Sequence, residues 1–227
     1  MIEGLFSKIE KLHTFELTNN PSEIDEFEKA CGYDLPEDMK TFYRRYKTIK
    51  LFDGEWGSTY RFVPVAEMKN TGFDIYGDSA NPDEFFWPRA WFTVCDVLDG
   101  NYISIDLSSR AGNDYNYIDC FHETYGIPGE SQVIAKSFRE LLERSLENGD
   151  QQFYLKEGFK GYGDALEIKP ETAILRISNK HDSSIGGWMV DFVRNNKSFR
   201  RYFDDNDYGN KDKSYDAAKQ NVDENKE

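Results

Sequence analysis

Residues 99–107 read Asp-Gly-Asn-Tyr-Ile-Ser-Ile-Asp-Leu, and residues 90–95, shortly before them, read Ala-Trp-Phe-Thr-Val-Cys. An Asp-Gly pair is the composition that tight β-hairpin turns favour. Apolar side chains that alternate with polar ones at a period of two are typical of a strand with one buried face. The two segments therefore predict an antiparallel hairpin whose turn lies at Asp99-Gly100.

More strands are predicted on both sides of this hairpin. Residues 60–65 form a strand that ends near Pro64, because proline cannot donate a hydrogen bond to a neighbouring strand. Residues 116–121 and 132–135 predict two further strands after the hairpin. Together these segments predict a meander of antiparallel strands.

Helices are predicted before the meander. Apolar residues recur at helical spacing over residues 4–13. A second helix begins at Ser22, which forms a capping-box-like pair with Asp25, and it ends at Gly32, a residue suited to a left-handed C-terminal position. A third helix begins at Pro36, whose missing N–H costs nothing in a first turn. One apolar stripe is predicted to follow: Met39, Phe42, Tyr43 and Tyr46.

A helix also closes the meander. Ser137 and Glu140 have the spacing of a capping box, and Gly149 marks the end of the apolar stripe that follows them. Helices, then strands, then a helix describe an α+β fold with an antiparallel-rich sheet, which we expect to form one domain at residues 1–157.

The composition is that of a globular protein without a membrane span. Of 227 residues, 38% are hydrophobic and 15% are aromatic, which is enough for a packed core. No run approaches the ~20 apolar residues that cross a bilayer, and the N-terminus lacks the pattern of a secretory signal. Cys31, Cys95 and Cys120 form no close pair. We therefore expect a cytoplasmic protein with reduced cysteines.

The net charge of −14 is unevenly distributed. Residues 1–170 hold 18 Lys and Arg against 31 Asp and Glu, a net of −13, whereas residues 171–227 hold 10 against 11, a net of −1. An acidic domain repels nucleic acid and attracts basic partners, although the same charge also serves solubility alone.

The last third of the chain predicts a second, smaller domain. Residues 158–172 are rich in glycine and polar residues and predict a linker or a closing loop. Three short strands are then predicted, at residues 173–177, 188–193 and 198–203. A helix at residues 211–221 completes a small three-stranded sheet plus helix, at residues 173–222, and residues 223–227 are expected to be a disordered tail.

Short motifs occur in a fixed order along residues 5–155. They are Pro21-Ser-Glu-Ile24 with Phe27-Glu28, Gly32-Tyr-Asp-Leu-Pro36-Glu-Asp38, Phe62-Val-Pro-Val65, Asp99 to Leu107, and Ile134-Ala-Lys-Ser-Phe-Arg-Glu-Leu-Leu142. In this order they resemble the SUKH superfamily, which contains bacterial immunity proteins and the fungal cell-wall glucan synthesis regulators. The resemblance implies a non-catalytic protein that binds and blocks a toxin, often a nuclease, made by the same or a neighbouring cell.

Under this interpretation the contact residues combine carboxylates with aromatic anchors. A nuclease presents a basic cleft, so an acidic inhibitor gains electrostatic complementarity, and aromatic residues are enriched at binding hot spots. The candidate toxin-binding residues are Asp53, Glu55, Trp56, Asp78, Asp83, Glu84, Trp87 and Trp91. The alternative is that the tryptophans belong to the core and the acidic residues to a solvated loop.

A second set of motifs covers residues 174–222. It consists of Gly187-Trp188, Lys197 with Phe199 and Phe203, Asp207-Tyr-Gly209, and Ala217-Ala218. These resemble the plant Apetala-type DNA-binding domain and its microbial relatives, in which a sheet contacts DNA. The resemblance implies these DNA-binding candidates: Arg176, Arg194, Lys197, Phe199, Arg200 and Arg201. Val193 departs from the plant pattern, which usually has arginine there, and an ordinary charged sheet face is the alternative.

Catalytic, metal-binding and cofactor-binding motifs are not predicted. His13, His122 and His181 lie in different predicted elements, and Cys120-x-His122 has no second pair at zinc spacing. No P-loop or nucleophile elbow occurs. Besides the immunity function, two alternatives stay open: a regulatory scaffold that uses the C-terminal sheet on DNA, and an enzyme.

Overall fold

The computed structural model describes residues 2–54, 59–80, 88–111, 114–127, 129–166, 174–177, 187–194 and 197–204. In the last three ranges, and at residues 110 and 111, only the course of the backbone is described. The chain divides into two compact units, of which the first holds residues 1–80, 89–125 and 131–165.

The described part of the first unit contains five α-helices and two short 3-10 helices. They are α1 (Glu3–Leu12), α2 (Glu23–Cys31), α3 (Glu37–Tyr43), η1 (Val65–Glu67), α4 (Thr71–Tyr76), α5 (Phe138–Glu147) and η2 (Phe153–Leu155).

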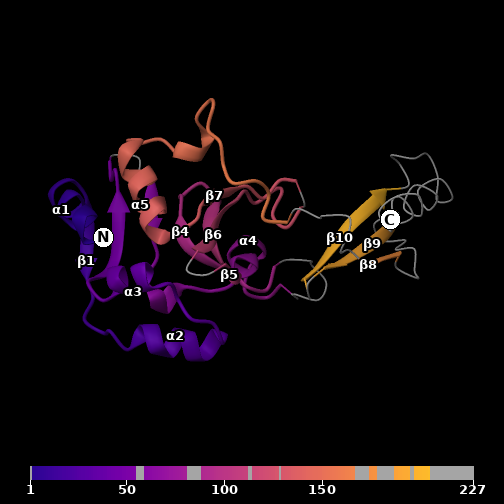
Figure 1. Ribbon diagram of the computed structural model, residues 1–227, viewed down its shortest axis with the longest axis horizontal. Coiled ribbons are helices and arrows are strands. Elements are labelled where there is room, and N and C mark those ends of the chain that lie inside the picture. Colours follow the sequence, from indigo (N-terminus) through magenta and orange to yellow (C-terminus); the bar gives the residue numbers. More distant parts are fainter. Residues whose placement is uncertain are drawn as a thin grey trace. The chain divides into compact units, whose positions relative to one another are not determined.

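The same unit holds a seven-stranded sheet in which every strand pairs antiparallel with the next one in sequence (Figure 1). Its strands are β1 (Thr14–Leu17), β2 (Tyr46–Leu51), β3 (Tyr60–Phe62), β4 (Trp91–Asp96), β5 (Tyr102–Ala111), β6 (Asp114–Cys120) and β7 (Val133–Ala135). The predicted hairpin joins β4 to β5, and Gly100 in its turn has a φ of 84°. The predicted α+β class and antiparallel meander are confirmed.

The main core lies between the sheet and helices α1, α3 and α5. Phe42 of α3 is fully buried, with its ring centroid 6.5 Å from that of Phe6 in α1 and 5.0 Å from that of Phe138 in α5. Phe138 also packs 5.7 Å from Phe62 of β3. These aromatic contacts attach three helices to one face of the sheet.

Helix α4 packs on the opposite face. Ser104 Oγ of β5 lies 2.6 Å from Thr71 Oγ1 of α4. The neighbours of Ser104 in the strand, Ile103 and Ile105, belong to the main core. Because successive residues of a strand point to opposite faces, α4 and the three core helices cover the sheet from its two sides.

Local capping agrees with the sequence at α5 and differs at α2. Ser137 Oγ accepts from Glu140 N at 3.1 Å, and Glu140 Oε2 accepts from Lys136 N at 2.7 Å. At α2 the predicted cap is wrong: the Ser22 hydroxyl makes no capping bond to the backbone and lies instead 2.8 Å from both Asn20 Oδ1 and Glu26 Oε1, to either of which it can donate. The reason is conformational, because Ser22 has a helical backbone (φ −71°, ψ −15°) that an N-cap residue does not adopt.

The sequence did not predict the strands β1 and β2, the helix α4, or the two 3-10 helices. Tyr46 was assigned to the stripe of the third helix, but that helix ends at Tyr43 and Tyr46 begins β2. Tyr46 is nevertheless fully buried, since the strand returns it to the same core. The short edge strand β1 is mostly exposed, so it lacks the alternation by which a strand is recognised.

The segment after η2 belongs to the first unit. Tyr162 N donates to Val133 O and Val133 N donates to Gly163 O, both at 2.8 Å, so this segment pairs with the edge strand β7. A Cβ on Gly161 would lie 2.6 Å from Val133 O, so this close approach needs glycine. The first unit therefore extends to Ala165, beyond the boundary predicted at residue 157.

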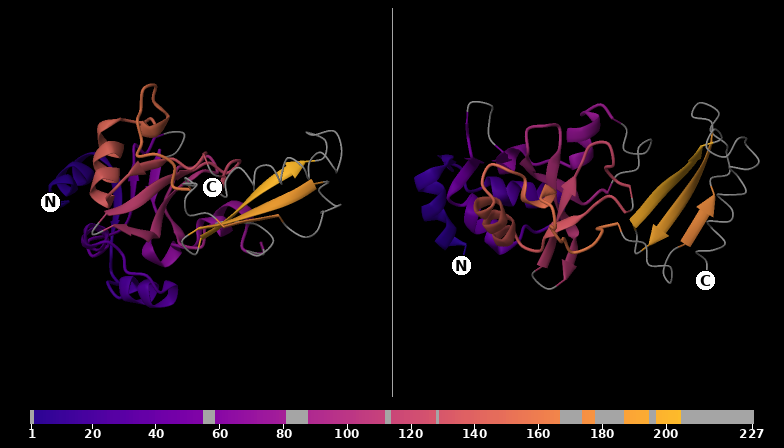
Figure 2. Two further views of the ribbon diagram at one scale, coloured as in Figure 1. Left: turned by 45° about the vertical axis from the view of Figure 1, so that its right-hand side comes forward. Right: turned by 90° about the horizontal axis from the view of Figure 1, so that it is seen from above.

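Three antiparallel strands are described in the second unit, in the order β10-β9-β8 (Figure 2). They are β8 (Ile174–Ile177), β9 (Gly187–Arg194) and β10 (Lys197–Asp204), which confirms the three predicted strands. The predicted helix at residues 211–221 and tail at residues 223–227 lie outside the described residues. In the part of the chain that the structure describes, no helix is long and apolar enough to cross a membrane.

Candidate functional site

Asp53 lies just after β2, where the first group of toxin-binding candidates begins. Its side chain is exposed, and its carboxylate accepts a hydrogen bond from Thr14 Oγ1 at 3.2 Å. The preceding residue, Phe52, has a φ of 56°, which is a strained conformation for a bulky side chain. Glu55 and Trp56 lie outside the described residues.

Asp78 follows α4 and represents the second group. Its side chain is 81% exposed, and its carboxylate forms an ion pair with Lys69 Nζ at 2.6 Å. Asp83, Glu84 and Trp87 lie outside the described residues. Among the described residues no hydrogen bond or ion pair joins Asp53 to Asp78, so these contacts do not bring the two predicted groups together.

Trp91 is an interior residue. Its side chain has no exposed surface, and its ring lies 5.9 Å from that of Tyr125, which is also buried. The indole Nε1 has no hydrogen-bond partner in the described part of the chain. A side chain in this position cannot reach a partner on the surface, so Trp91 supports the fold on the α4 side of the sheet.

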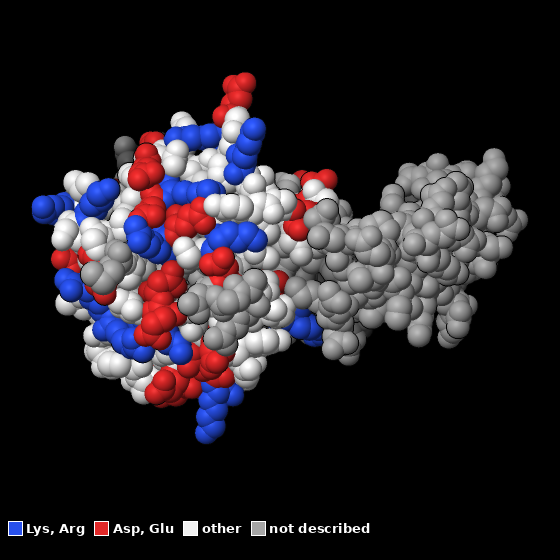
Figure 3. Space-filling model, viewed as in Figure 1, with Lys and Arg blue, Asp and Glu red and all other residues white. Residues whose placement is uncertain are grey.

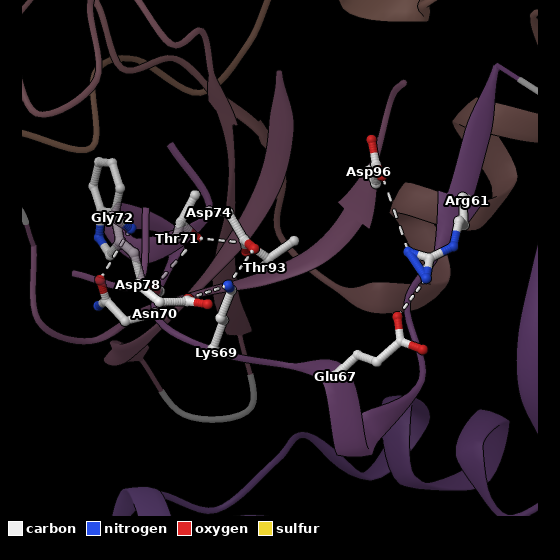
Figure 4. A network of polar contacts seen from close by, with 11 residues as sticks. Arg61, Glu67, Lys69, Asn70, Thr71, Gly72, Asp74, Asp78, Thr93 and Asp96 are labelled. Carbon is white, nitrogen blue, oxygen red and sulfur yellow. Dashed lines mark hydrogen bonds and ion pairs between the residues drawn. The ribbon is translucent and has the colours of Figure 1, made fainter. Parts of the chain in front are cut away.

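The described structure places a network of ion pairs beside Asp78 (Figure 4). Lys69 Nζ lies 3.3 Å from Asp74 Oδ1 as well as 2.6 Å from Asp78 Oδ1. Thr93 Oγ1 of β4 donates to Asp74 Oδ2 at 2.5 Å. The lysine is therefore held between two carboxylates, one half-buried and one exposed.

A second cation continues this network along the sheet. Arg61 of β3 pairs with Glu67 of η1, and its other guanidinium nitrogen lies 4.0 Å from Asp96 of β4 (Figure 4). Arg61 and Asp96 are partners in the β3–β4 register, so strand pairing sets this contact. We name the six residues the paired network: Arg61, Glu67, Lys69, Asp74, Asp78 and Asp96.

The carboxylates of the paired network act on one another. Burial raises the pKa of Asp74 above its ordinary value, and the charge of Asp96 adds to this rise, while Thr93 and Lys69 lower it. The pKa of Tyr102 is raised by burial and then by Asp74 and Asp96. The hydrogen bond to Asp78 is the first cause of the raised pKa of Lys69. The charges of Asp74 and Asp96 thus reach Tyr102, and Lys69 opposes them.

The sequence carries a signal for part of this network. Asn70 Oδ1 accepts from Gly72 N at 3.0 Å and caps α4. An asparagine before a helical turn is a recognised start signal, and it would have predicted α4 together with Asp74. The pairing of Arg61 with Asp96 had no such signal, because it depends on strand register.

Histidine, cysteine and acidic side chains occur throughout the described residues. They include no group of three or more His, Cys, Asp and Glu side chains that could hold a metal ion. Burial raises the pKa of the thiols of Cys31, Cys95 and Cys120, so these free cysteines stay protonated and weakly nucleophilic. His13 Nδ1 accepts from Phe52 N at 3.2 Å, and His122 Nδ1 lies 2.8 Å from Asn101 Oδ1.

Residues 18–144 match the model of the SMI1 / KNR4 family (SUKH-1). This match spans more than half of the chain and runs from α2 into α5. The chain belongs to the SMI1/KNR4 family. The SUKH resemblance predicted from the short motifs is thereby confirmed, whereas the comparisons give no support for the Apetala-type resemblance.

The SMI1/KNR4 chain also resembles a curated bacterial protein. Over 137 residues it is 34% identical to a protein named "Immunity protein YokJ" from Bacillus subtilis (strain 168). The aligned region covers 60% of this chain and 79% of that relative. The whole paired network lies inside the range matched by the family model.

Proposed function

We propose that this chain is an immunity protein, which binds a toxin protein and blocks it without catalysing a reaction. The observation that carries the proposal is the 34% identity to a protein named as an immunity protein, over 79% of that protein's length. We place its action in the cytoplasm.

We further propose that the toxin is basic, and a nuclease is the class that this chemistry favours. Residues 1–170 carry a net charge of −13, and a nuclease needs a basic surface to hold its substrate. Acidic and basic side chains interleave on the face of the first unit that Figure 3 shows, so complementarity would come from local carboxylates.

The proposed contact residues keep the sequence prediction, apart from Trp91. Asp53 and Asp78 are both exposed and acidic, as a contact with a basic protein requires. Glu55, Trp56, Asp83, Glu84 and Trp87 stay in the proposal on sequence grounds. Trp91 is left out because its side chain is fully buried.

Co-expression tests this function directly. The toxin encoded by the gene next to this one is expressed in a sensitive bacterium with and without the chain, and cell survival is counted. We expect survival only with the chain, and a complex of the two purified proteins whose affinity falls as salt shortens the Debye length from ~10 Å at 0.1 M to ~3 Å at 1 M. Death of the cells despite soluble expression of the chain would contradict the proposal.

The backbone register favours a second candidate, contact of the three-stranded sheet with DNA. Arg194 and Lys197 are partners across β9 and β10, and they lie on the same face as Phe199 and Arg201. Arg176 and Arg200 lie on the other face, in one row with Asp191 between them. The six predicted residues therefore form two groups on opposite faces of the sheet. The group of Arg194, Lys197, Phe199 and Arg201 suits phosphate better, because no acidic residue lies between its members.

A mobility-shift assay of the full chain with random duplex DNA at low salt tests this candidate. We expect a shift that Arg194→Gln with Lys197→Gln abolishes and Arg176→Gln with Arg200→Gln leaves in place. The absence of any shift for the full chain would exclude DNA as a partner of this sheet.

A further inference from the structure

A hollow of about 650 Å³ lies in the first unit. Its walls come from three separate segments: the start of β3, the end of β4, and the chain after α5. The lining residues that matter below are Thr59, Val97, Asp150, Gln152, Leu155 and Glu157. The volume is within the ~300–1,000 Å³ of ligand pockets, which gives room for a long side chain with water.

The hollow is held open by hydrogen bonds between its walls. Thr59 Oγ1 donates to Asp150 O at 2.8 Å, and Tyr60 OH donates to Gln151 O at 3.1 Å. Phe153 N donates back to Tyr60 OH at 2.9 Å. A surface that is fixed before binding loses less conformational entropy when a partner arrives.

The hairpin between β4 and β5 is fixed in the same way. Gln152 Nε2 donates to Asp99 Oδ2 at 3.3 Å, which ties the segment after α5 to the hairpin tip. Leu98 has a φ of 64°, a strained conformation for a non-glycine residue, and Asp96 Oδ1 holds it by accepting from Leu98 N at 2.7 Å. Strain of this kind persists only where the surroundings fix the backbone.

The lining of the hollow combines aliphatic and acidic side chains. Val97 lies in the wall with almost no exposed surface, while Leu155 is 69% exposed and Leu98, next to Val97, is 48% exposed. Asp150 and Glu157 are exposed, and within the described residues their carboxylates make no hydrogen bond or ion pair. Their charges are therefore available to a partner.

The lysine in this lining does not cancel that charge. Lys156 Nζ donates to both O and Oδ1 of Asn148 at 3.0 Å, so its ammonium caps the end of α5. A ligand for the hollow consequently needs an aliphatic stem for Val97 and Leu155 and a cationic end for Asp150 and Glu157. Lysine and arginine side chains have this combination.

We propose that this hollow receives a lysine or arginine side chain of the toxin, which rests on the immunity function proposed above. A protruding protein side chain suits the site better than a free small molecule, because several wall residues are exposed to solvent. The segment with Asp150 and Glu157 lies beyond residues 18–144, the range that the family model matches.

Titration of the labelled full chain by NMR tests the hollow without the toxin. The probes are acetyl-arginine methylamide and acetyl-lysine methylamide, and acetyl-citrulline methylamide is the uncharged control. We expect the backbone amides of Val97, Gln152 and Leu155 to shift with both cationic probes and at least about threefold less with citrulline, since an exposed charge pair contributes up to ~1 kcal/mol.

A matched pair of double variants locates the charge. Asp150→Asn with Glu157→Gln should weaken probe binding at least about threefold, since it removes both free carboxylates. Asp25→Asn with Glu3→Gln removes the same two charges from exposed positions on α2 and α1 and should leave binding unchanged. Equal binding by both variants, equal binding of citrulline, or no shift of these amides would each overturn the proposal.

The probe-binding test of the hollow and the survival test of the immunity function can fail independently of each other. Cells that survive the toxin while the hollow ignores the cationic probes would refute the hollow and leave the immunity function standing. Cells that die although the hollow binds arginine would refute the immunity function alone. If the cells survive and the hollow binds arginine, the Asp150 and Glu157 variant should also bind the purified toxin about tenfold more weakly than the Asp25 and Glu3 variant, as an interfacial charge pair implies.

Discussion

The carboxylates of the paired network and those of the hollow differ in how their charge is compensated. Lys69 already lies between Asp74 and Asp78, and Arg61 lies between Glu67 and Asp96. Asp150 and Glu157 have no such partner among the described residues. A carboxylate that is paired within its own chain gains little from a second cation, whereas a free one keeps its full attraction for a partner.

The total acidic charge of a domain and the number of its carboxylates that are free to bind a partner are different properties. The count of acidic residues predicts the field around the domain, but not which carboxylates are free to bind. We therefore expect Asp74, the half-buried carboxylate of the paired network, to contribute to folding, and Asp150 and Glu157 of the hollow to contribute to binding. The substitutions below test that division on one purified chain, beginning with the core that both regions share.

Phe138→Ala should have the largest effect. Phe138 is fully buried and contacts Phe42, Phe62 and Tyr117, so its removal leaves a cavity in the core and should cost about 3–5 kcal/mol of unfolding free energy. Urea unfolding followed by circular dichroism measures this. Because both carboxylate groups are attached to this core, the network and the hollow should be lost in one transition, and two separate transitions would contradict a single folding unit.

Asp74→Ala should have the next largest effect. Asp74 is half-buried, and its loss removes the charged hydrogen-bond partner of the buried Thr93 hydroxyl, which keeps only Thr71 Oγ1 at 3.1 Å, and leaves Lys69 paired with Asp78 alone. We expect a loss of about 1–3 kcal/mol of unfolding free energy. Asp78→Ala is the control, because Asp78 is 81% exposed and should change stability by less than about 0.5 kcal/mol. Equal losses for the two variants would show that burial does not separate them.

The sequence predicted much of the frame that carries these residues. The Asp99-Gly100 turn, the alternation of Ile103 and Ile105, and the Ser137 cap predicted the hairpin, its buried face and the start of α5 correctly. These are local signals, in which a few neighbouring residues determine the conformation.

The sites were harder to predict, because they depend on contacts between distant segments. The hollow joins Thr59, Val97 and Asp150, which lie far apart in the chain. Leu155 and Glu157 lie just before residues 158–172, which the sequence predicts as a linker. This stretch is attached by the pairing of Tyr162 with Val133 in the edge strand β7, and β7 is too short to give a clear strand pattern. Composition predicted Trp91 as an interface residue, yet a tryptophan suits a core equally well.

Asp119→Asn tests a third kind of carboxyl group, one that is half-buried and has no partner among the described residues. Asp119 lies in β6, and burial, followed by the charge of Asp99, raises its pKa to about 6 from an ordinary value of 3.8. No hydrogen bond or ion pair to its carboxylate is present in the described part of the chain. The charged form is therefore disfavoured in the folded state.

The sign of the pH effect follows from this raised pKa. Below pH 3.8 the group is protonated in both states, and as the pH rises through about 6 the folded chain loses stability relative to the unfolded one. Asp119→Asn should consequently match the wild type at acid pH and be about 1 kcal/mol more stable at pH 7, a value reduced for partial exposure. Urea unfolding at several pH values measures this, and a variant less stable at pH 7 would contradict it.

Asp150→Asn with Glu157→Gln should have the smallest effect on stability. Both side chains are exposed and unpaired in the described structure, so their charges support no internal contact, and unfolding free energy should change by less than about 0.5 kcal/mol. The same variant should lose toxin affinity, whereas Asp74→Ala should lose stability first, and parallel measurements of urea unfolding and toxin binding compare the two. A double variant that unfolds as easily as Asp74→Ala would mean that the carboxylates of the hollow also hold the fold together, and the proposed division between the two regions would fail.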